Sequence, residues 1–324
     1  MSARGANALL AVAVVAMFAL SLTAGKIWVP PATWLSGGPG GWILLELRLP
    51  RAILAGAIGA ALGLSGAVLQ GYLRNPLADP ALVGISSTAA LGAVSAIFFG
   101  LAAAPAIVFA SAMTGAALAV VVLALLVGRS GSAIAFILAG MVLSSLSGSL
   151  TAFLISIAPN PFATSEIVSW LMGALTDRSM DDVRLALPPI AAGMLLLAFT
   201  GRSLDVLSLG EETARSLGLA TGRLQATIAI GLGLAVGAGV AVSGVVGFVG
   251  LIVPHLVRPL VGQKPSALLL PSALGGAALL LAADSLVRLT PGAGEVRLGI
   301  AMALIGTPFF FALLAAMRKR PLWG

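Results

Sequence analysis

The sequence predicts an all-α polytopic membrane protein, and three observations support that fold class. Hydrophobic residues make up 59% of the 324 residues and charged residues only 9%, whereas soluble domains carry about 25% charged residues. The mean hydropathy is +1.10. The apolar stretches reach the length of about 20 residues that a helix needs to cross a bilayer. A chain this poor in charge cannot cover a water-facing surface of its own size, which excludes an ordinary soluble enzyme and a disordered chain.

Ten membrane spans fit between the charged residues and turn signals. We predict them at about residues 7–24, 48–72, 84–103, 105–129, 133–157, 185–200, 224–242, 244–261, 266–287 and 298–317. The polar stretch before the sixth span contains a short helix, Glu166 to Leu175, that is too brief to cross. The first apolar run exceeds the about 7 to 15 residues of a signal-peptide core, so we interpret it as an uncleaved span.

The boundaries follow turn residues and charges in chain order. A proline- and glycine-rich stretch, 26–41, separates the first two spans, and the turn at 75–80 precedes the third. Pro105 opens the fourth span, and Ala133 opens the fifth. A charged loop at 202–223 separates the sixth span from the seventh, Lys264 marks the turn before the ninth, and the loop 288–297 leads to the tenth.

The basic residues are divided unequally between the two sides of this map. The side that holds both termini carries eleven of the 18 Lys and Arg residues and four of the 11 Asp and Glu residues. The other side carries seven of each, so the whole net charge of +7 lies on the terminal side. Loops rich in Lys and Arg stay in the cytoplasm. We therefore expect cytoplasmic termini and interpret the positive charge as a membrane signal rather than a nucleic-acid site.

A faint internal repeat suggests two halves of inverted topology. Four residues recur 178 positions later: Gly59, Ser65, Gly66 and Pro76 match Gly237, Ser243, Gly244 and Pro254. Five spans separate the copies, and an odd number inverts the second copy, as in many transporters. We predict one permease domain over residues 1–324, with a first half at about 1–184, a cytoplasmic coupling loop at 202–223 and a second half at 224–324.

Several kinds of chemistry are missing from the sequence. No span carries a charge near its centre, which disfavours a proton- or sodium-coupled carrier. The chain lacks a G-x-x-x-x-G-K-[ST] phosphate loop, so any ATP-driven pumping must use a partner. It has no cysteine, and its single histidine, His255, is more typical of an ordinary hydrogen-bonded residue than of a metal ligand. We expect no metal site, no catalytic residue and no cofactor bound by this chain.

The charged loop predicts a short amphipathic helix. Ser208 precedes Glu211 by three residues, the spacing of a capping box. Glu211 and Arg215 are four apart and can form an ion pair, and Gly218 is a typical helix stop. Leu209 and Leu217 share one face of this segment. From these residues alone, a helix lying on the membrane surface and a docking helix for a cytoplasmic partner are equally good interpretations.

Two further patterns have both a structural and a functional interpretation. Arg48, Arg51 and Arg288 lie at the predicted outer ends of spans two and nine, where arginine commonly anchors a helix to lipid headgroups. They could instead meet carboxylates of an external protein. The fifth span carries small residues every four positions: Gly140, Ser144, Gly148 and Ala152. Such a stripe more often packs helices closely than lines a substrate path.

Four strings resemble those of a known family. They are R-L-P-R at 48–51, N-P-L-A-D-P at 75–80, A-R-S-L-G at 214–218 and G-F-V-G-L-I-V-P-H-L-V-R at 247–258. The chain resembles the FecCD-type permeases of bacterial ABC importers, which take up iron chelates, heme and vitamin B12, from about Arg48 to Arg318. The resemblance implies ten helices per subunit, a vitamin B12 importer permease-like fold, and a multi-pass homodimer in the bacterial inner membrane. It also implies two cytoplasmic ATPase subunits, which bind ATP and Mg²⁺, and a periplasmic substrate-binding protein.

The resemblance also implies roles for particular residues. ATPase coupling is implied for Ser208, Leu209, Glu211, Glu212, Arg215, Leu217 and Gly218. Binding-protein docking is implied for Arg48, Arg51 and Arg288. The translocation path and its cytoplasmic gate are implied for Ser130, Ser132, Met141, Ser144, Ser145 and Gly148. The strings G-E-V-R-L-G at 294–299 and A-L-T-D-R-S at 174–179 resemble the heme-uptake branch, with siderophore or cobalamin as alternative cargo.

Overall fold

The computed structural model describes residues 3–34, 38–128, 132–291 and 294–319, and every regular element in these ranges is a helix. Eight helical segments are long and apolar enough to cross a membrane. They are α1 (Ala3–Thr23), the continuous run α2 (Pro39–Trp42), η2 (Ile43–Arg48) and α3 (Leu49–Tyr72), α5 (Pro105–Val127), α6 (Ala133–Ser156), α8 (Met180–Phe199) running on into α9 (Gly201–Leu207), α11 (Thr221–Ser243), α13 (Pro265–Arg288) and α14 (Leu298–Lys319).

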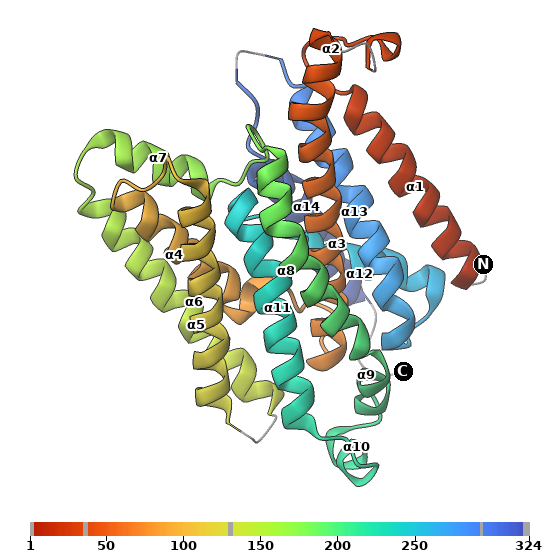
Figure 1. Cartoon of the computed structure of the whole chain (residues 1–324). Coiled ribbons are helices and arrows are strands. Elements are labelled where there is room, and N and C mark those ends of the chain that lie inside the picture. Colours follow the sequence, from red (N-terminus) through yellow and green to blue (C-terminus); the bar gives the residue numbers. More distant parts are fainter. Residues whose placement is uncertain (1–2, 35–37, 129–131, 292–293, 320–324) are drawn as a thin grey trace.

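Two shorter apolar helices complete the ten expected segments. These are α4 (Ile85–Phe98) and α12 (Val249–Val261). Both begin within the bundle rather than at its edge, and they run toward opposite ends of it (Figure 1). A left-handed residue precedes each one: Gly84 has φ +81° and Phe248 has φ +69°. The span predicted at 84–103 began correctly but ran past the end of α4 at Phe98, and the span predicted at 244–261 began before the turn at Phe248 that precedes α12.

The inverted halves are visible in the order of elements. Each half has a long helix, a turn, a short helix with a left-handed N-cap and another long helix: α3, α4 and α5 in one, α11, α12 and α13 in the other. The residue-by-residue repeat, however, is wrong. Pro76 lies in the loop after α3, whereas Pro254 lies inside α12. The two halves therefore share an architecture, but the four matched residue pairs do not all occupy equivalent positions in it.

Glycines bring α3 and α13 into close contact at the centre of the bundle. A Cβ atom added to Gly63 would lie 2.1 Å from the Ser272 carbonyl oxygen, and one added to Gly59 would lie 2.3 Å from that of Gly276. Both distances are far below van der Waals contact, so the two backbones approach as closely as only glycine permits. The two halves therefore pack directly on each other, since α3 belongs to the first and α13 to the second.

The second span begins well before its predicted start. Its helix begins at Pro39 rather than Arg48, and Ile43–Arg48 is a π-helical stretch. Pro50 follows at once, and proline lacks the N–H that a regular α-helix would use there. Arg48 and Arg51 consequently lie inside a long helix and not at its end.

The remaining helices lie in the connections. The helix α7 (Pro161–Leu171) confirms the short helix expected there, and Asn160 caps it by accepting from the Ala163 N–H at 2.9 Å. Two single-turn helices, η1 (Pro31–Thr33) and η3 (Pro80–Val83), and α10 (Glu211–Ser216) complete the order. The helix α10 lies at one end of the bundle, whereas α2 and α7 lie at the opposite end (Figure 1). We call these the α10 end and, following the predicted topology, the outer end.

Candidate functional sites

The loop between α9 and α11 forms the compact helix α10 that the sequence predicted, but its start is different. The N-cap is Gly210, which has φ +105° and offers no side chain. Ser208 instead donates its hydroxyl to the Asp205 carbonyl oxygen at 2.6 Å, at the end of the preceding helix. The predicted capping box is therefore wrong, because the chain needs a left-handed glycine to turn between α9 and α10.

The predicted ion pair and glycine stop of this helix are both present. Arg215 Nη2 lies 2.7 Å from Glu211 Oε1, which joins the two ends of α10. Gly218 follows with φ +85° and donates its N–H to the Arg215 carbonyl oxygen at 2.9 Å, which ends the helix. Leu209 and Leu217 are 62% and 63% exposed. The element is a short helix at the α10 end, flanked by two exposed leucines.

The three arginines predicted at the outer ends of the spans are buried side chains and not exposed cations. Arg48, Arg51 and Arg288 are only 6%, 8% and 3% exposed. Arg48 and Arg288 lie at the C-terminal end of α1. The last carbonyl groups of a helix have no partner within it, and cations are favourable there.

Arg48 and Arg288 satisfy those carbonyl groups. Arg48 donates to the carbonyl oxygens of Leu22 at 2.9 Å and Thr23 at 3.0 Å. Arg288 donates to the Ser21 carbonyl oxygen at 2.9 Å and also to the Ser21 hydroxyl. The two arginines thus bind the end of α1 to α3 and α13.

A buried carboxylate balances the arginines. Asp284 is fully buried; its Oδ1 lies 2.9 Å from Arg51 Nη2, and its Oδ2 lies 2.9 Å from Arg288 Nη2. Glu295 Oε2 lies 2.8 Å from Arg51 Nη2. Sequence reasoning missed both acids. The signal was available, because Asp284 precedes Arg288 by four residues inside an apolar helix, where a carboxylate needs a partner.

The arginine cluster also borders a small cavity at the outer end. This cavity has a volume of about 220 Å³, and Arg48, Arg51 and Arg288 all line it. Asp177 and Arg178 line it as well. The docking role of the three arginines stays a prediction, but their charges are already balanced largely within the chain.

The predicted path residues divide between two faces of α6. Ser144 donates to the Ala81 carbonyl oxygen at 3.4 Å, and a Cβ on Gly140 would lie 2.8 Å from the Leu82 carbonyl oxygen, so this face packs on η3. Met141, Ser145 and Gly148 are exposed along a second face. The predicted stripe of small residues therefore packs against η3 at Gly140 and Ser144, and its later residues are exposed.

The gate residues are only partly described. Ser132 is the N-cap of α6, and its hydroxyl oxygen accepts from the Ala135 N–H at 3.3 Å. Ser130 lies outside the described residues. His255 lies in α12, with its ring 5.9 Å from that of Phe309. Within the described ranges, no group of three or more His, Cys, Asp or Glu side chains could hold a metal ion.

Comparisons with known proteins agree with this architecture over nearly the whole chain. The profile of the FecCD transport family matches residues 12–316. The chain belongs to the FecCD transport family. It is 41% identical over 288 residues to the cobalamin import system permease protein BtuC of Halobacterium salinarum, covering 86% of this chain and 75% of that one. It is 35% identical over 312 residues to the hemin transport system permease protein HmuU of Yersinia pestis, covering 94% and 91%.

A solved structure extends the likeness to three dimensions. It describes an inward-facing conformation of a transporter assigned to the metal-chelate ABC type, with a TM-score of 0.86 and 32% identity, and the match covers 97% of this chain and 99% of that one. This FecCD protein is thus the permease subunit of an ABC importer and a multi-pass membrane protein. Within the described residues, its eight long and two shorter apolar helices correspond to the ten segments that the sequence predicted.

Proposed function

We propose that this permease imports a metal tetrapyrrole, heme or cobalamin, across the bacterial inner membrane by alternating access. The supporting observation is the nearly full-length likeness to one permease named for cobalamin and to another named for hemin. The short strings at 174–179 and 294–299 favour heme. The two cargoes share a large metal-bearing ring, and that shared class is our proposal.

The absence of metal-ligating clusters in the described residues is compatible with this class of cargo. The four ring nitrogens of a tetrapyrrole already coordinate its metal in the plane of the ring. A permease can therefore move the cargo along small and apolar surfaces without providing metal ligands. The exposed face of α6 has this character: Met141, Ser145 and Gly148 lie along it at spacings of four and three residues. We propose that two copies of the chain pair and that this face lines the path between them.

The energy source in this proposal is a separate pair of ATPase subunits. They would bind ATP and Mg²⁺, while this chain binds no cofactor of its own. The exposed leucines beside α10 are the proposed contact for them. A periplasmic binding protein would deliver the cargo at the outer end, near the cavity that the buried arginines line. The second candidate, a gradient-driven carrier, is disfavoured because no Asp, Glu, Lys or Arg lies near the centre of a predicted span, and His255 is the single histidine of the sequence.

The cargo can be tested with the binding protein that serves this permease. Purified from cells grown with heme and cobalamin, it should carry a pigment whose absorption spectrum shows porphyrin or corrin bands. It should also dock on the reconstituted permease. A binding protein that docks but retains only a ferric siderophore would overturn the tetrapyrrole proposal while leaving the importer assignment in place.

The proposed orientation makes its own prediction. The native chain has no cysteine, so single-cysteine variants can be labelled without removing other thiols. We expect a membrane-impermeant maleimide to label Asp181→Cys in intact cells, because the Asp181 side chain is 80% exposed at the outer end. Arg223→Cys should react only after the membrane is opened. Labelling of Arg223→Cys in intact cells would invert the topology.

A further inference from the structure

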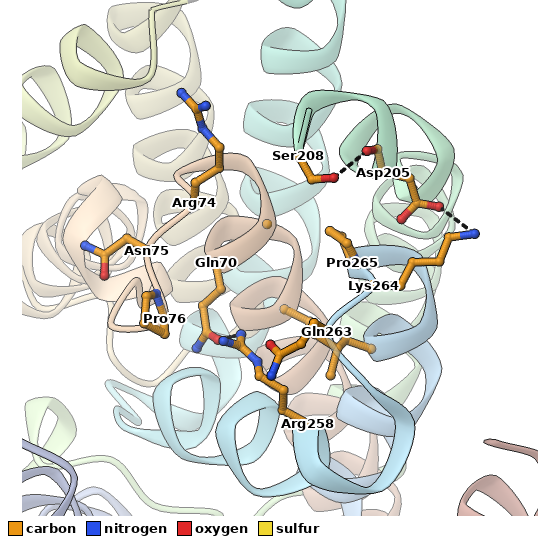
Figure 2. A pocket seen from close by; sticks show the side chains of 13 residues that line it. Gln70, Arg74, Asn75, Pro76, Asp205, Ser208, Arg258, Gln263, Lys264 and Pro265 are labelled. Carbon is orange, nitrogen blue, oxygen red and sulfur yellow. Dashed lines mark hydrogen bonds and ion pairs between the residues drawn. The ribbon is translucent and has the colours of Figure 1, made fainter. Parts of the chain in front are cut away.

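A large cavity lies at the α10 end, and neither the exposed leucines nor α6 line it. It has a volume of about 600 Å³, which is typical of a small-molecule site. The end of α3, the loop after it, α9 and the turn between α12 and α13 form its walls (Figure 2). Its polar lining residues are Gln70, Arg74, Asn75, Asp205, Ser208, Arg258, Gln263 and Lys264.

The lining carries three cations and one carboxylate. The carboxylate, Asp205, is already occupied: its Oδ2 lies 3.3 Å from Lys264 Nζ, and its Oδ1 accepts from the Ser266 N–H at 2.9 Å. Figure 2 shows the Lys264 ammonium turned toward Asp205. Arg74 and Arg258 are therefore left without a carboxylate partner among the described residues.

Arg258 is the stronger indication of a missing ligand. Its Nη2 donates to Gln70 Oε1 at 2.9 Å, which is a neutral acceptor, and its Nε is buried without a partner among the described residues. A half-buried cation held only by an amide is unfavourable, because burial removes water that nothing charged replaces. Arg74, whose side chain is exposed, borders the same cavity but points away from Arg258 (Figure 2).

We infer that this cavity binds a phosphate-bearing anion through Arg258. A guanidinium group binds phosphate oxygens with paired, charge-assisted hydrogen bonds, and the Gln263 amide lies beside Arg258 as a neutral donor (Figure 2). In the proposed orientation the cavity faces the cytoplasm. An anionic lipid headgroup and a free phosphate compound are both available there, and both have this chemistry.

Gln70 connects the cavity to the centre of the bundle. Gln70 Nε2 donates to the Gly250 carbonyl oxygen at 3.2 Å and to the Ala78 carbonyl oxygen at 3.4 Å. Gly250 is in the first turn of α12, and Ala78 precedes η3. An anion on Arg258 would therefore stabilise the junction at which α12 and η3 meet α3, and binding should raise the unfolding temperature of the whole chain.

The test uses the full chain purified in a maltoside detergent, which contains no phosphate. Its unfolding temperature is measured with added phosphatidylglycerol, with inorganic phosphate, and with sodium chloride at matched ionic strength. We expect one of the first two to raise the unfolding temperature beyond the chloride control. A response to the lipid alone identifies a headgroup as the source, and a response to phosphate identifies a soluble anion.

Two variants connect the response to the cavity. Arg258→Gln removes the guanidinium group, and Arg258→Lys keeps a cation there without the paired donors. The anion concentration for half the response should rise about tenfold or more in Arg258→Gln and less in Arg258→Lys. Arg202→Gln, on the exposed side of α9 and outside the cavity, is the matched control and should respond as the native chain does. Equal responses in the native chain and in Arg258→Gln, or none beyond chloride, would overturn the inference.

Discussion

Replacing Asp284 by alanine is expected to destabilise the permease by about 3–5 kcal/mol, the usual cost of removing one partner from a buried ion pair. The carboxylate is fully buried and lies 2.9 Å from both Arg51 and Arg288. Without it, Arg288 keeps only carbonyl and hydroxyl partners, and two buried guanidinium groups repel each other. The contacts among α1, α3 and α13 should loosen together, since all three helices meet at this cluster.

Thermal unfolding in detergent measures this effect, and Asp181→Ala is the matched control. Asp181 also pairs with an arginine, Arg184, at 2.8 Å, but the two side chains are 80% and 74% exposed. An exposed pair contributes about 0 to 1 kcal/mol, so the control should unfold close to the native temperature. Equal effects in the two variants would show that the buried cluster is not what holds α1 in place.

The second large effect concerns α10. Replacing Leu209 and Leu217 by aspartate should abolish co-purification of the ATPase and ATP-driven uptake. Burying a leucine contributes about 1.5–3 kcal/mol, so two lost contacts weaken binding about 100-fold or more. The membrane level of the permease should stay normal, because both residues are more than 60% exposed and no span is altered.

Ser208→Ala is the control for this pair: the resemblance implies a coupling role for Ser208, but the structure gives its hydroxyl no contact with α10. It lies next to Leu209, yet its hydroxyl serves only the end of α9 and does not cap α10. The ATPase should therefore bind this variant as it binds the native chain. If Leu209→Asp/Leu217→Asp also co-purifies with the ATPase and supports uptake, the docking assignment is wrong and the energy enters elsewhere.

The sequence predicted the number of spans because long apolar runs and charged loops are local features. It placed the start of α4 to within one residue but placed the start of α12 at 244 rather than Val249, since that start depends on the left-handed residue Phe248. A phenylalanine in that conformation has no sequence signature. Tertiary packing accommodates this phenylalanine, because its ring lies against Gly306, which is far along the chain. A Cβ added to Gly306 would lie 2.2 Å from the Phe248 ring.

The outer arginines show the same limit for a functional site. Their residue type and position suggested exposed cations, but their partners come from α1, α13 and the loop after it, up to 267 residues away. Long-range partners of this kind are set by packing. The α10 helix was easier to predict from the sequence, because the Glu211–Arg215 pair and the Gly218 stop lie within one short segment.

We propose that this chain moves a metal tetrapyrrole only when a separate ATPase drives it. The decisive measurement is uptake into proteoliposomes that contain the permease, its ATPase and the binding protein, with heme or cobalamin outside. We expect uptake that requires the ATPase and hydrolysable ATP and that does not depend on proton or sodium gradients. Uptake by the permease alone, driven by an ion gradient, would show that the proposal is wrong.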